Sequence, residues 1–263
     1  MTPWNGKWAL VTGASAGIGQ ALAEQLAAGG ANLVLTARRK DRLEQLARRL
    51  SMKHAIRGEV FAADLSNATA PDEIFTFTRE RGIDVDVLVN NAGFGVYGPF
   101  SGAGLPRQLE MVRVNVAAVV HLTYLFLPLM IERHRGFILI VASTAAFQGV
   151  PYISTYAATK AFDLHFAEGL AEEVRGSGVK VTALCPGSTA TEFQAVAGQP
   201  AHTYGLKESA EKVAGVGLKA LARGKTCAIS GVHNWIGVEG QRLAPRWVVP
   251  RIAAKLFQPQ RSI

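Results

Sequence analysis

Apolar runs of strand length alternate with helix-patterned segments along this chain. In order, the runs read WALVTG, ANLVLTA, EVFAAD, DVLVNNAG, GFILIVAS, VKVTALCPG and TCAISG. Between them apolar residues recur at helical spacing, as at Leu43, Leu46, Ala47 and Leu50. Strands that alternate with helices form a parallel sheet covered on both faces. The pattern therefore predicts an α/β fold, a doubly wound parallel sheet of about seven strands with helices on both faces.

Nothing in the 263 residues separates one domain from another. The chain contains no internal repeat, low-complexity tract or linker. Hydrophobic residues make up 49%, enough for a large core, and charged residues only 18%, which argues against a disordered chain. We therefore expect residues 1–263 to form a single domain.

The net charge of +8 is concentrated at the carboxyl end. Residues 240–263 contain five basic and no acidic residues, so the rest of the chain carries only +3. A nucleic-acid-binding surface would interleave basic residues with stacking aromatics in the body of the chain, and no such stripe occurs there. No nucleic-acid partner is expected.

Cys185 and Cys227 have neither metal-ligand spacing nor the pattern of a disulfide framework. We expect reduced thiols, no metal site and a cytoplasmic location, since the amino terminus also lacks the apolar core of a signal peptide. Residues 114–131 form an apolar run, but His121 and Pro128 within it would be costly or disruptive in lipid. A core or subunit-facing helix is expected there.

The first strand runs into a turn that carries Gly13, Gly17 and Gly19, followed by an amphipathic helix. Glycines at such a turn let the backbone approach a pyrophosphate, and the helix N-terminus presents free amides and a positive dipole end to it. The fold is therefore predicted to be of the Rossmann type and to bind a dinucleotide.

The end of the second strand discriminates between cofactors. An acidic residue there would bind an adenosine ribose, but this chain has Ala37, followed by Arg38, Arg39 and Lys40. Guanidinium groups recognise a 2′-phosphate, so NADP(H) is favoured over NAD(H). The alternative is that these charges only solvate the next helix, which applies to Arg39 and Lys40 more than to Arg38.

Several further motifs occur in a fixed order. They are TGASAGIG at 12–19, AADL around Asp64, NNAG at 90–93, VNV around Asn115, Ser143, YAATK at 156–160 and PGSTAT at 186–191. Ser143 stands thirteen residues before Tyr156. With these motifs the chain resembles the short-chain dehydrogenase/reductase family, in its single-domain branch, from residue 6 to residue 231.

The resemblance implies a role for each matching position. Asp64 would contact the adenine, Asn90 would shape the cofactor cleft, and Asn115 would hold a water in a proton relay. Ser143 would bind the substrate oxygen, and Pro186, Gly187 and Thr191 would border the nicotinamide. The expected catalytic residues are Asn115, Ser143, Tyr156 and Lys160. The expected cofactor-binding residues are Gly13, Ser15, Gly17, Ile18, Gly19, Arg38, Arg39, Asp64, Leu65, Asn91, Ala92, Gly93, Tyr156, Lys160, Pro186, Gly187, Thr189 and Thr191.

Some of these residues have plainer explanations. Asn115 and Ser143 are also the kind of polar group that a core satisfies internally, and Asp64 could simply cap a helix or a turn. Many relatives that use NADP carry a basic residue inside the glycine turn, where this chain has Ala16. The 2′-phosphate would then depend mainly on Arg38.

Tyr156 and Lys160 are four residues apart and would share one face of a helix, whereas Tyr152 lies two turns from the lysine. A nearby ammonium lowers an acid's pKa by about 1–3 units, which would bring the Tyr156 phenolate toward working pH. Tyr156 is therefore predicted to exchange the proton and Lys160 to hold the nicotinamide ribose. Tyr152 is expected to line the pocket or to pack.

The resemblance also implies that residues 188–208 cover the substrate. Apolar and aromatic residues here and after the NNAG motif indicate an apolar pocket, so we expect a hydrophobic ketone, aldehyde or oxoacyl compound as substrate. The expected pocket residues are Phe94, Tyr97, Tyr152 and Phe193, with Val96, Val196 and Tyr204 as further apolar candidates.

Residues 232–263 form an amphipathic tail in which apolar residues alternate with cations. Its spacing predicts a basic helix broken or begun at Pro245 and Pro250. Packing against the body is expected first, and contact with an anionic membrane, a cover over the substrate mouth and a role in an oligomer are the alternatives.

The prediction for the whole chain is an NADP-dependent oxidoreductase that moves hydride between nicotinamide and a carbonyl or secondary alcohol. The alternatives are a catalytically idle NADP-binding sensor and a membrane-surface protein that acts through its tail. The resemblance further implies a homodimer or homotetramer built through the helices that carry Asn115 and Tyr156.

Overall fold

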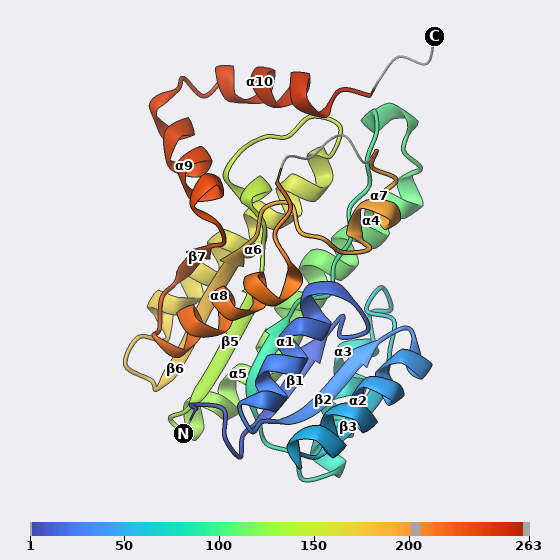
Figure 1. Cartoon of the computed structure of the whole chain (residues 1–263), viewed down its shortest axis with the longest axis vertical. Coiled ribbons are helices and arrows are strands. Elements are labelled where there is room, and N and C mark those ends of the chain that lie inside the picture. The colour runs from blue at the N-terminus through green and yellow to red at the C-terminus, as the bar shows by residue number, and fades with distance from the viewer. Residues whose placement is uncertain (1, 201–205, 260–263) are drawn as a thin grey trace.

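The computed structural model describes residues 2–200 and 206–259. Within them seven parallel strands form one sheet in the order β3-β2-β1-β4-β5-β6-β7 (Figure 1). The strands are β1 (Trp8–Thr12), β2 (Asn32–Ala37), β3 (Gly58–Ala62), β4 (Val85–Asn90), β5 (Gly136–Val141), β6 (Val179–Cys185) and β7 (Cys227–Ile229). Each strand falls on one of the seven apolar runs, with β3 and β4 each beginning one residue before its run, so the predicted doubly wound parallel sheet of the Rossmann type is confirmed.

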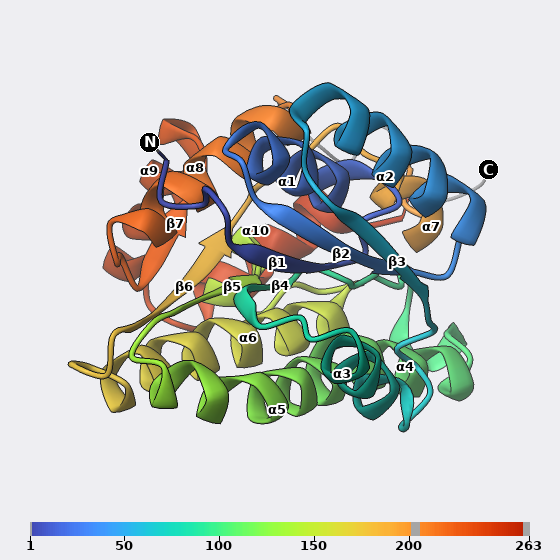
Figure 2. The ribbon, with the colours of Figure 1, turned by 90° about the horizontal axis from the view of Figure 1, so that it is seen from below.

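Helices cover both faces of the sheet (Figure 2). One face carries α1 (Gly17–Ala28), α2 (Lys40–His54) and α8 (Ala210–Ala222), and the other carries α3 (Ala70–Glu80), α5 (Ala118–Glu132) and α6 (Ser154–Glu173). Apolar residues of the two layers pack on the sheet as two clusters, one with Leu22, Leu43 and Val213, the other with Leu122 and Leu164. Both faces are buried, which is why most of the strands read as continuous apolar runs.

The apolar run predicted as a core helix lies against the sheet. The helix α4 (Leu105–Val112), the π-helical turn η2 (Arg113–Ala117) and α5 form one helical run, Leu105–Glu132. Among the described residues this one run is long and apolar enough to cross a membrane by length and composition. Here its inner side, with Met111 and Phe126, belongs to the core, and its outer side exposes Val120 and Tyr124.

The strand order reverses at β1, which lies between β2 and β4. In such sheets a crevice opens beyond the carboxyl ends of the strands at the reversal, because the helices that follow leave on opposite faces. Three short helices follow strands in the sequence: η1 (Phe100–Gly102) after β4, η3 (Thr144–Phe147) after β5 and α7 (Phe193–Ala197) after β6.

The tail folds as α9 (Val232–Gly240), η5 (Gln241–Leu243) and α10 (Val248–Phe257), and α10 lies across the end of the molecule in Figure 1. α10 begins between the two prolines that were predicted to break or begin it. Pro250 falls in its first turn, where a missing N–H leaves no helical hydrogen bond unmade. Cys185 and Cys227 are free thiols on neighbouring strands, with Sγ atoms 3.9 Å apart.

Candidate active site

A cavity at the carboxyl edge brings together every residue that was predicted to bind the cofactor. It is lined by Gly13, Ser15, Gly17, Ile18, Gly19, Arg38, Arg39, Asp64, Leu65, Asn91, Ala92, Gly93, Tyr156, Lys160, Pro186, Gly187, Thr189 and Thr191. Ser143 lines it as well. These residues come from seven separate parts of the sequence, so the fold gathers them.

The turn after β1 has no room for side chains. Gly13 has a φ of +66°, and a Cβ at Gly19 would stand 2.3 Å from the Gly13 carbonyl oxygen. α1 begins at Gly17, and no side chain caps its first turn. Its free amides and positive end therefore meet the cavity, which suits a pyrophosphate.

Arg39 reaches back from the end of β2 into this turn. Its guanidinium donates to the Ser15 hydroxyl at 3.1 and 3.2 Å and to the Glu192 carboxylate at 2.7 Å. Lys40, the first residue of α2, pairs instead with Glu44 and lies outside the cavity lining. Arg39 therefore places a cation beside the glycine turn, where Ala16 offers none. This position favours the predicted cofactor-binding role of Arg39 over the alternative that it only solvates the next helix.

Arg38 and Asp64 lie next to each other at the same end of the cavity. The Arg38 guanidinium is 4.0 Å from the Asp64 carboxylate and 3.8 Å from that of Glu110. Asp64 also accepts a hydrogen bond of 2.9 Å from the Ser66 amide. Asp64 thus holds a turn and also lines the cavity, and its contact with the adenine stays a prediction.

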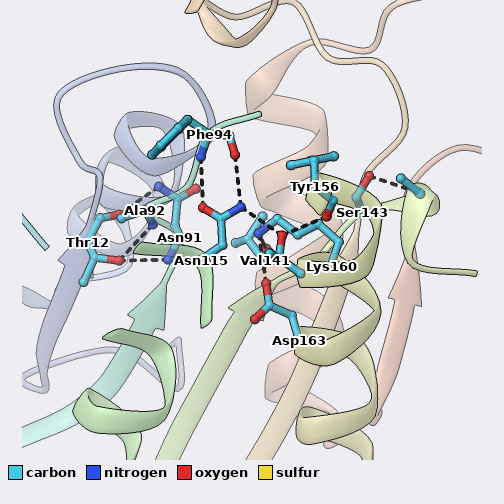
Figure 3. A network of polar contacts seen from close by, with 12 residues as sticks. Thr12, Asn91, Ala92, Phe94, Asn115, Val141, Ser143, Tyr156, Lys160 and Asp163 are labelled. Atoms are coloured by element: carbon cyan, nitrogen blue, oxygen red, sulfur yellow. Dashed lines mark hydrogen bonds and ion pairs between the residues drawn. The ribbon is translucent and has the colours of Figure 1, made fainter. Parts of the chain in front are cut away.

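The two asparagines after β4 point in opposite directions, because successive side chains of a strand alternate. Asn90 is buried and donates to the Thr123 hydroxyl of α5 at 3.0 Å, away from the cavity, which corrects its predicted place in the cleft. Asn91 donates to the Thr12 carbonyl at 2.8 Å. The Thr12 hydroxyl in turn accepts the Asn91 and Ala92 amides at 2.9 and 3.0 Å, which ties the glycine turn to β4 (Figure 3).

Tyr156 and Lys160 share one wall of the cavity, as their spacing predicts. Tyr156 stands in the first turn of α6, and its ring centroid is 5.1 Å from that of Phe193. The Lys160 ammonium is buried one turn further on, where it donates to the Val141 carbonyl at 2.7 Å and to Asp163 Oδ2 at 3.0 Å (Figure 3).

The protonation of Tyr156 is governed first by burial. Burial raises the pKa of Tyr156, and the charge of Lys160 and a hydrogen bond with Ser143 lower that pKa by less than burial raises it. The sequence predicts the opposite net direction, since the spacing reveals the lysine but not the desolvation. The phenol is therefore held in its protonated form.

Asn115 stands in the π-helical turn η2, fully buried behind the cavity wall. Its amide donates to the Phe94 carbonyl and the Thr159 hydroxyl at 3.0 Å each, and its oxygen accepts the Phe94 amide at 3.1 Å. The side chain thus fastens the segment after β4 to α6. A π-turn is a feature often found at functional sites. The water relay that the resemblance implies for Asn115 stays a prediction.

Two of the four residues predicted to form the substrate pocket line the cavity, and two do not. Phe94 and Phe193 line it, but Tyr97 and Tyr152 do not. Tyr97 is turned toward the tail and donates to the Phe257 carbonyl at 2.8 Å. Tyr152 has a φ of +66°, and its own carbonyl accepts the Gly98 amide. Within residues 188–208, Val196 lines the cavity, whereas Tyr204 lies outside the described residues.

The structure adds residues that sequence reasoning missed. They are Asp163 beside Lys160, Glu192 beside Arg39, Thr159 beside Asn115, and Asn234 and Phe257 in the cavity lining. Asp163 could have been found as a carboxylate at i+3 from the lysine. The others depend on contacts between distant parts of the chain.

Known proteins with this sequence pattern decide the family. A family model described as short chain dehydrogenase matches residues 7–201. The chain is a short-chain dehydrogenase. Its glycine turn, with no room for a Cβ and an uncapped helix start beyond, fits the dinucleotide that such enzymes use.

Two relatives show how far the likeness of this short-chain dehydrogenase extends. A very-long-chain 3-oxoacyl-CoA reductase of Bos taurus is 35% identical over 73% of the chain and 62% of its own length. A hydroxysteroid dehydrogenase-like protein 1 of Gallus gallus is 31% identical over 92% of the chain and 73% of its own length. The chain thus spans less than two thirds of the first of these relatives.

Solved structures have the same fold. A short-chain dehydrogenase from Sphingobium yanoikuyae in complex with NADPH aligns with a TM-score of 0.82 and 31% identity, over 90% of this chain and 93% of its own. A bulky-bulky ketone specific alcohol dehydrogenase from Comamonas testosteroni aligns with a TM-score of 0.78 and 27% identity, over 98% of this chain and 97% of its own. A short chain dehydrogenase/reductase from Burkholderia phymatum in complex with NAD aligns with a TM-score of 0.84 and 24% identity, over 92% of this chain and 95% of its own. At this level of identity the likeness shows the fold alone.

Proposed function

We propose that this short-chain dehydrogenase is an NADP(H)-dependent reductase of apolar ketones, aldehydes or oxoacyl compounds. That it is an oxidoreductase acting on CH–OH and carbonyl groups follows from its family. The observation that carries the proposal is the shared cavity wall of Tyr156 and Lys160, between the glycine turn and the apolar residues around Phe193.

Two arginines support the choice of NADP. Arg38 and Arg39 line the cavity beside the glycine turn, at the position where the second strand ends without an acidic residue. A guanidinium matches a phosphate in charge and in its pair of parallel donors. NADPH bound to the Sphingobium yanoikuyae relative agrees with this choice, whereas NAD in the Burkholderia phymatum structure shows that the fold accepts either cofactor.

The residues of this chain supply the proton and the orientation. Tyr156 donates its phenolic proton to the carbonyl oxygen, and Ser143 binds the same oxygen from the end of β5. Lys160, fixed at the Val141 carbonyl, holds the ribose hydroxyls and compensates the phenolate that is left behind. When bound, the reduced nicotinamide supplies the hydride for the carbonyl carbon.

Apolar groups around the phenol support an apolar substrate. Phe94, Phe193, Val196 and Phe257 line the same cavity as Tyr156, and the Phe193 ring centroid is 5.1 Å from that of Tyr156. Two relatives are named for substrates of this kind, a very-long-chain oxoacyl compound and a bulky-bulky ketone. A site built from such side chains favours extended or ring-shaped carbonyl compounds over sugars.

A catalytically idle NADP-binding sensor would retain the glycine turn and the two arginines only. Such a protein has no use for a buried lysine beside a cavity-lining tyrosine, because a buried ammonium costs free energy that only its partners offset. The combination of Tyr156, Lys160, Ser143 and Asn115 therefore favours the enzyme.

The assembly and location of the protein belong to the same proposal. Free cysteines suit a reducing, cytoplasmic compartment. The exposed apolar side chains Val120 and Tyr124 of α5 and Phe162 of α6 suit a homodimer or homotetramer formed through these two helices. Light scattering of the purified chain tests this assembly, and a purely monomeric species contradicts it.

A carbonyl panel tests the function. The purified chain is assayed with NADPH and with NADH against medium-chain ketones, aromatic aldehydes, 3-oxoacyl thioesters and sugars, and the loss of reduced-nicotinamide absorbance is followed. We expect turnover of apolar carbonyls with NADPH and a Tyr156→Phe control without activity. A preference for sugars, or equal rates in the control, overturns the proposal.

A further inference from the structure

The outer face of η5 and α10 combines large apolar side chains with cations. Leu243 is 91% exposed, Trp247 62%, Ile252 55% and Leu256 67%. Ile252 and Leu256 are one helical turn apart, so they share a side of α10. An exposed apolar row of this size is unusual on the surface of a soluble monomeric protein, and such rows mark interaction sites.

Cations accompany this row without any acidic residue. Residues 240–259 contain Arg242, Arg246, Arg251 and Lys255 and neither Asp nor Glu. Arg242 pairs with Glu239 at 3.0 Å, and the described part of the chain places no carboxylate in an ion pair with the other three. The Arg251 guanidinium lies over the Trp247 ring, 4.6 Å from its centroid.

The inner face of α10 is fixed to the body of the protein. Ala253 is buried against Val150, Ile153 and Ala157, and Tyr97 donates to the Phe257 carbonyl at 2.8 Å. Phe257 lines the cavity beside Phe193 and Val196. α10 thus contributes Phe257 to the cavity wall and lies across one end of the molecule (Figure 1), and the side chains of the apolar and cationic row are exposed.

We propose that the outer face of η5 and α10 docks on an anionic membrane surface, so that an apolar substrate can enter the site from the lipid. Trp with flanking Arg and Lys suits the headgroup region, where ring and alkyl parts contact acyl chains and the charged ends stay in the polar layer. A second copy of the chain is disfavoured as occupant, because a two-fold contact would place like charges against each other. The membrane docking does not depend on the proposed function. The entry of substrate from the lipid does depend on the proposed function.

Vesicle co-sedimentation of the full chain tests the docking. Vesicles of phosphatidylglycerol with phosphatidylcholine are compared with phosphatidylcholine alone, at low and high salt. We expect binding to the anionic vesicles that weakens with salt, and a loss of about 100-fold in affinity for the variant Arg246→Gln/Arg251→Gln/Lys255→Gln. The variant Trp247→Ser/Ile252→Ser/Leu256→Ser should lose binding as well.

A matched control removes the same charge elsewhere. Arg48→Gln/Lys53→Gln/Lys225→Gln changes three exposed cations away from α10 and should bind like the wild type. Equal binding of the α10 charge variant and this control, or no binding to anionic vesicles, overturns the docking. If the wild type binds no vesicles and the α10 variants lose a dimer that the wild type forms, the face binds a second copy of the chain instead. Reduction of a small water-soluble carbonyl without vesicles reports separately on the proposed function.

A second inference comes from an independent feature, the buried carboxylate of Asp163. Asp163 is 0% exposed and Lys160 5%. Oδ2 accepts the Lys160 ammonium at 3.0 Å, while Oδ1 has no hydrogen-bond partner among the described residues. A buried carboxylate satisfied on one oxygen only is costly, so it calls for a purpose beyond packing.

The groups that act on Tyr156 come from three elements. Lys160 and Asp163 belong to α6, Ser143 follows β5 and Cys185 ends β6. Burial raises the pKa of Asp163 despite its contact with Lys160, and the negative charge of Asp163 in turn raises the pKa of Tyr156. The two charges of the pair therefore oppose each other at the phenol.

We infer that Asp163 is a positioning residue that holds the Lys160 ammonium at the Val141 carbonyl and offsets its charge, which keeps Tyr156 protonated and ready to donate. This inference rests on the proposed function. It predicts a bias toward carbonyl reduction, since reduction starts from the phenol and alcohol oxidation from the phenolate.

Asp163→Asn removes the charge and keeps the shape. We expect the alkaline limb of reduction, and the rising limb of alcohol oxidation, to move to lower pH by about one unit. Asp163→Ser should give the same shift if charge is responsible. Glu172→Gln, an exposed carboxylate on the same helix, is the matched control and should leave both limbs in place.

A titration without turnover keeps this test separate from the proposed function. The ultraviolet difference between each protein and its own Tyr156→Phe form reports the phenolate directly. A lower titration point in Asp163→Asn supports the inference even if no substrate is found. An unchanged point, with an altered thermal midpoint only, reduces Asp163 to a structural role.

Discussion

The Arg39 guanidinium donates to the Glu192 carboxylate at 2.7 Å and so joins the N-terminus of α2 to the N-terminus of α7. Arg42 donates to the other oxygen of Glu192 at 2.8 Å. These hydrogen bonds from Arg42 and Arg39 lower the pKa of Glu192, so the carboxylate stays charged at neutral pH. Glu192 therefore pairs with the Arg39 guanidinium, which a 2′-phosphate of the cofactor would also bind.

Removing this competitor should tighten cofactor binding. We expect Glu192→Gln to raise the affinity for NADPH severalfold and to leave that for NADH nearly unchanged, because only NADPH carries the extra phosphate. Fluorescence titration of both cofactors measures the difference. Equal gains for the two cofactors would mean that Glu192 affects the conformation at the start of α7 and not phosphate recognition.

Arg39 should discriminate between the cofactors. Replacing Arg39 by Ala removes a charge-assisted hydrogen bond worth about 1.5–3 kcal/mol, so NADPH affinity should fall by about tenfold or more. Lys40→Ala is the matched control, since Lys40 pairs with Glu44 outside the cavity. If Arg39→Ala binds NADPH as tightly as the wild type, Arg38 alone would recognise the 2′-phosphate.

Tyr156→Phe should abolish turnover and preserve cofactor binding. Loss of a general acid costs about 10²–10⁴ in rate, while the ring that faces Phe193 remains. Tyr152→Phe is the control, because Tyr152 lies outside the cavity lining and should retain near-normal kcat. The assignment of the proton donor is wrong if the first variant keeps most of its activity.

The pH dependence of reduction should follow the buried phenol. The pKa of Tyr156 is raised mainly by burial, and donation needs the protonated form, which is present below that pKa and lost above it. Reduction should therefore stay level through neutral pH and decline only above about 10, the ordinary value for tyrosine. kcat/KM measured against pH, with NADPH binding followed in parallel, shows whether an earlier decline comes from the phenol.

Phe193 should contribute to substrate affinity. Phe193→Ala removes a ring that packs on Tyr156 and lines the cavity, so KM for apolar ketones should rise by about tenfold and NADPH affinity should change little. Tyr97→Phe deletes only a hydroxyl directed at the Phe257 carbonyl and serves as control. A KM unchanged in Phe193→Ala would place the substrate elsewhere in the cavity.

Local patterns in the sequence were sufficient for the sheet and for the centre of the site. Apolar runs predicted each strand, because strands buried on both faces need continuous apolar residues. The spacing of Tyr156 and Lys160 placed them on one wall, since residues four apart share a helix face whatever surrounds the helix. The glycine turn likewise follows from backbone sterics within a few residues.

Only the tertiary structure decided which charges meet and which are buried. Arg39 turns to Ser15 and Glu192, Asn90 turns away from the cleft, and α10 adds Phe257 to the cavity lining. All three depend on contacts between residues far apart in the chain. The net direction of the Tyr156 pKa also depends on burial, which spacing alone does not reveal. The sequence thus determined the fold and the reacting pair, and long-range packing determined the electrostatics and the walls of the site around them.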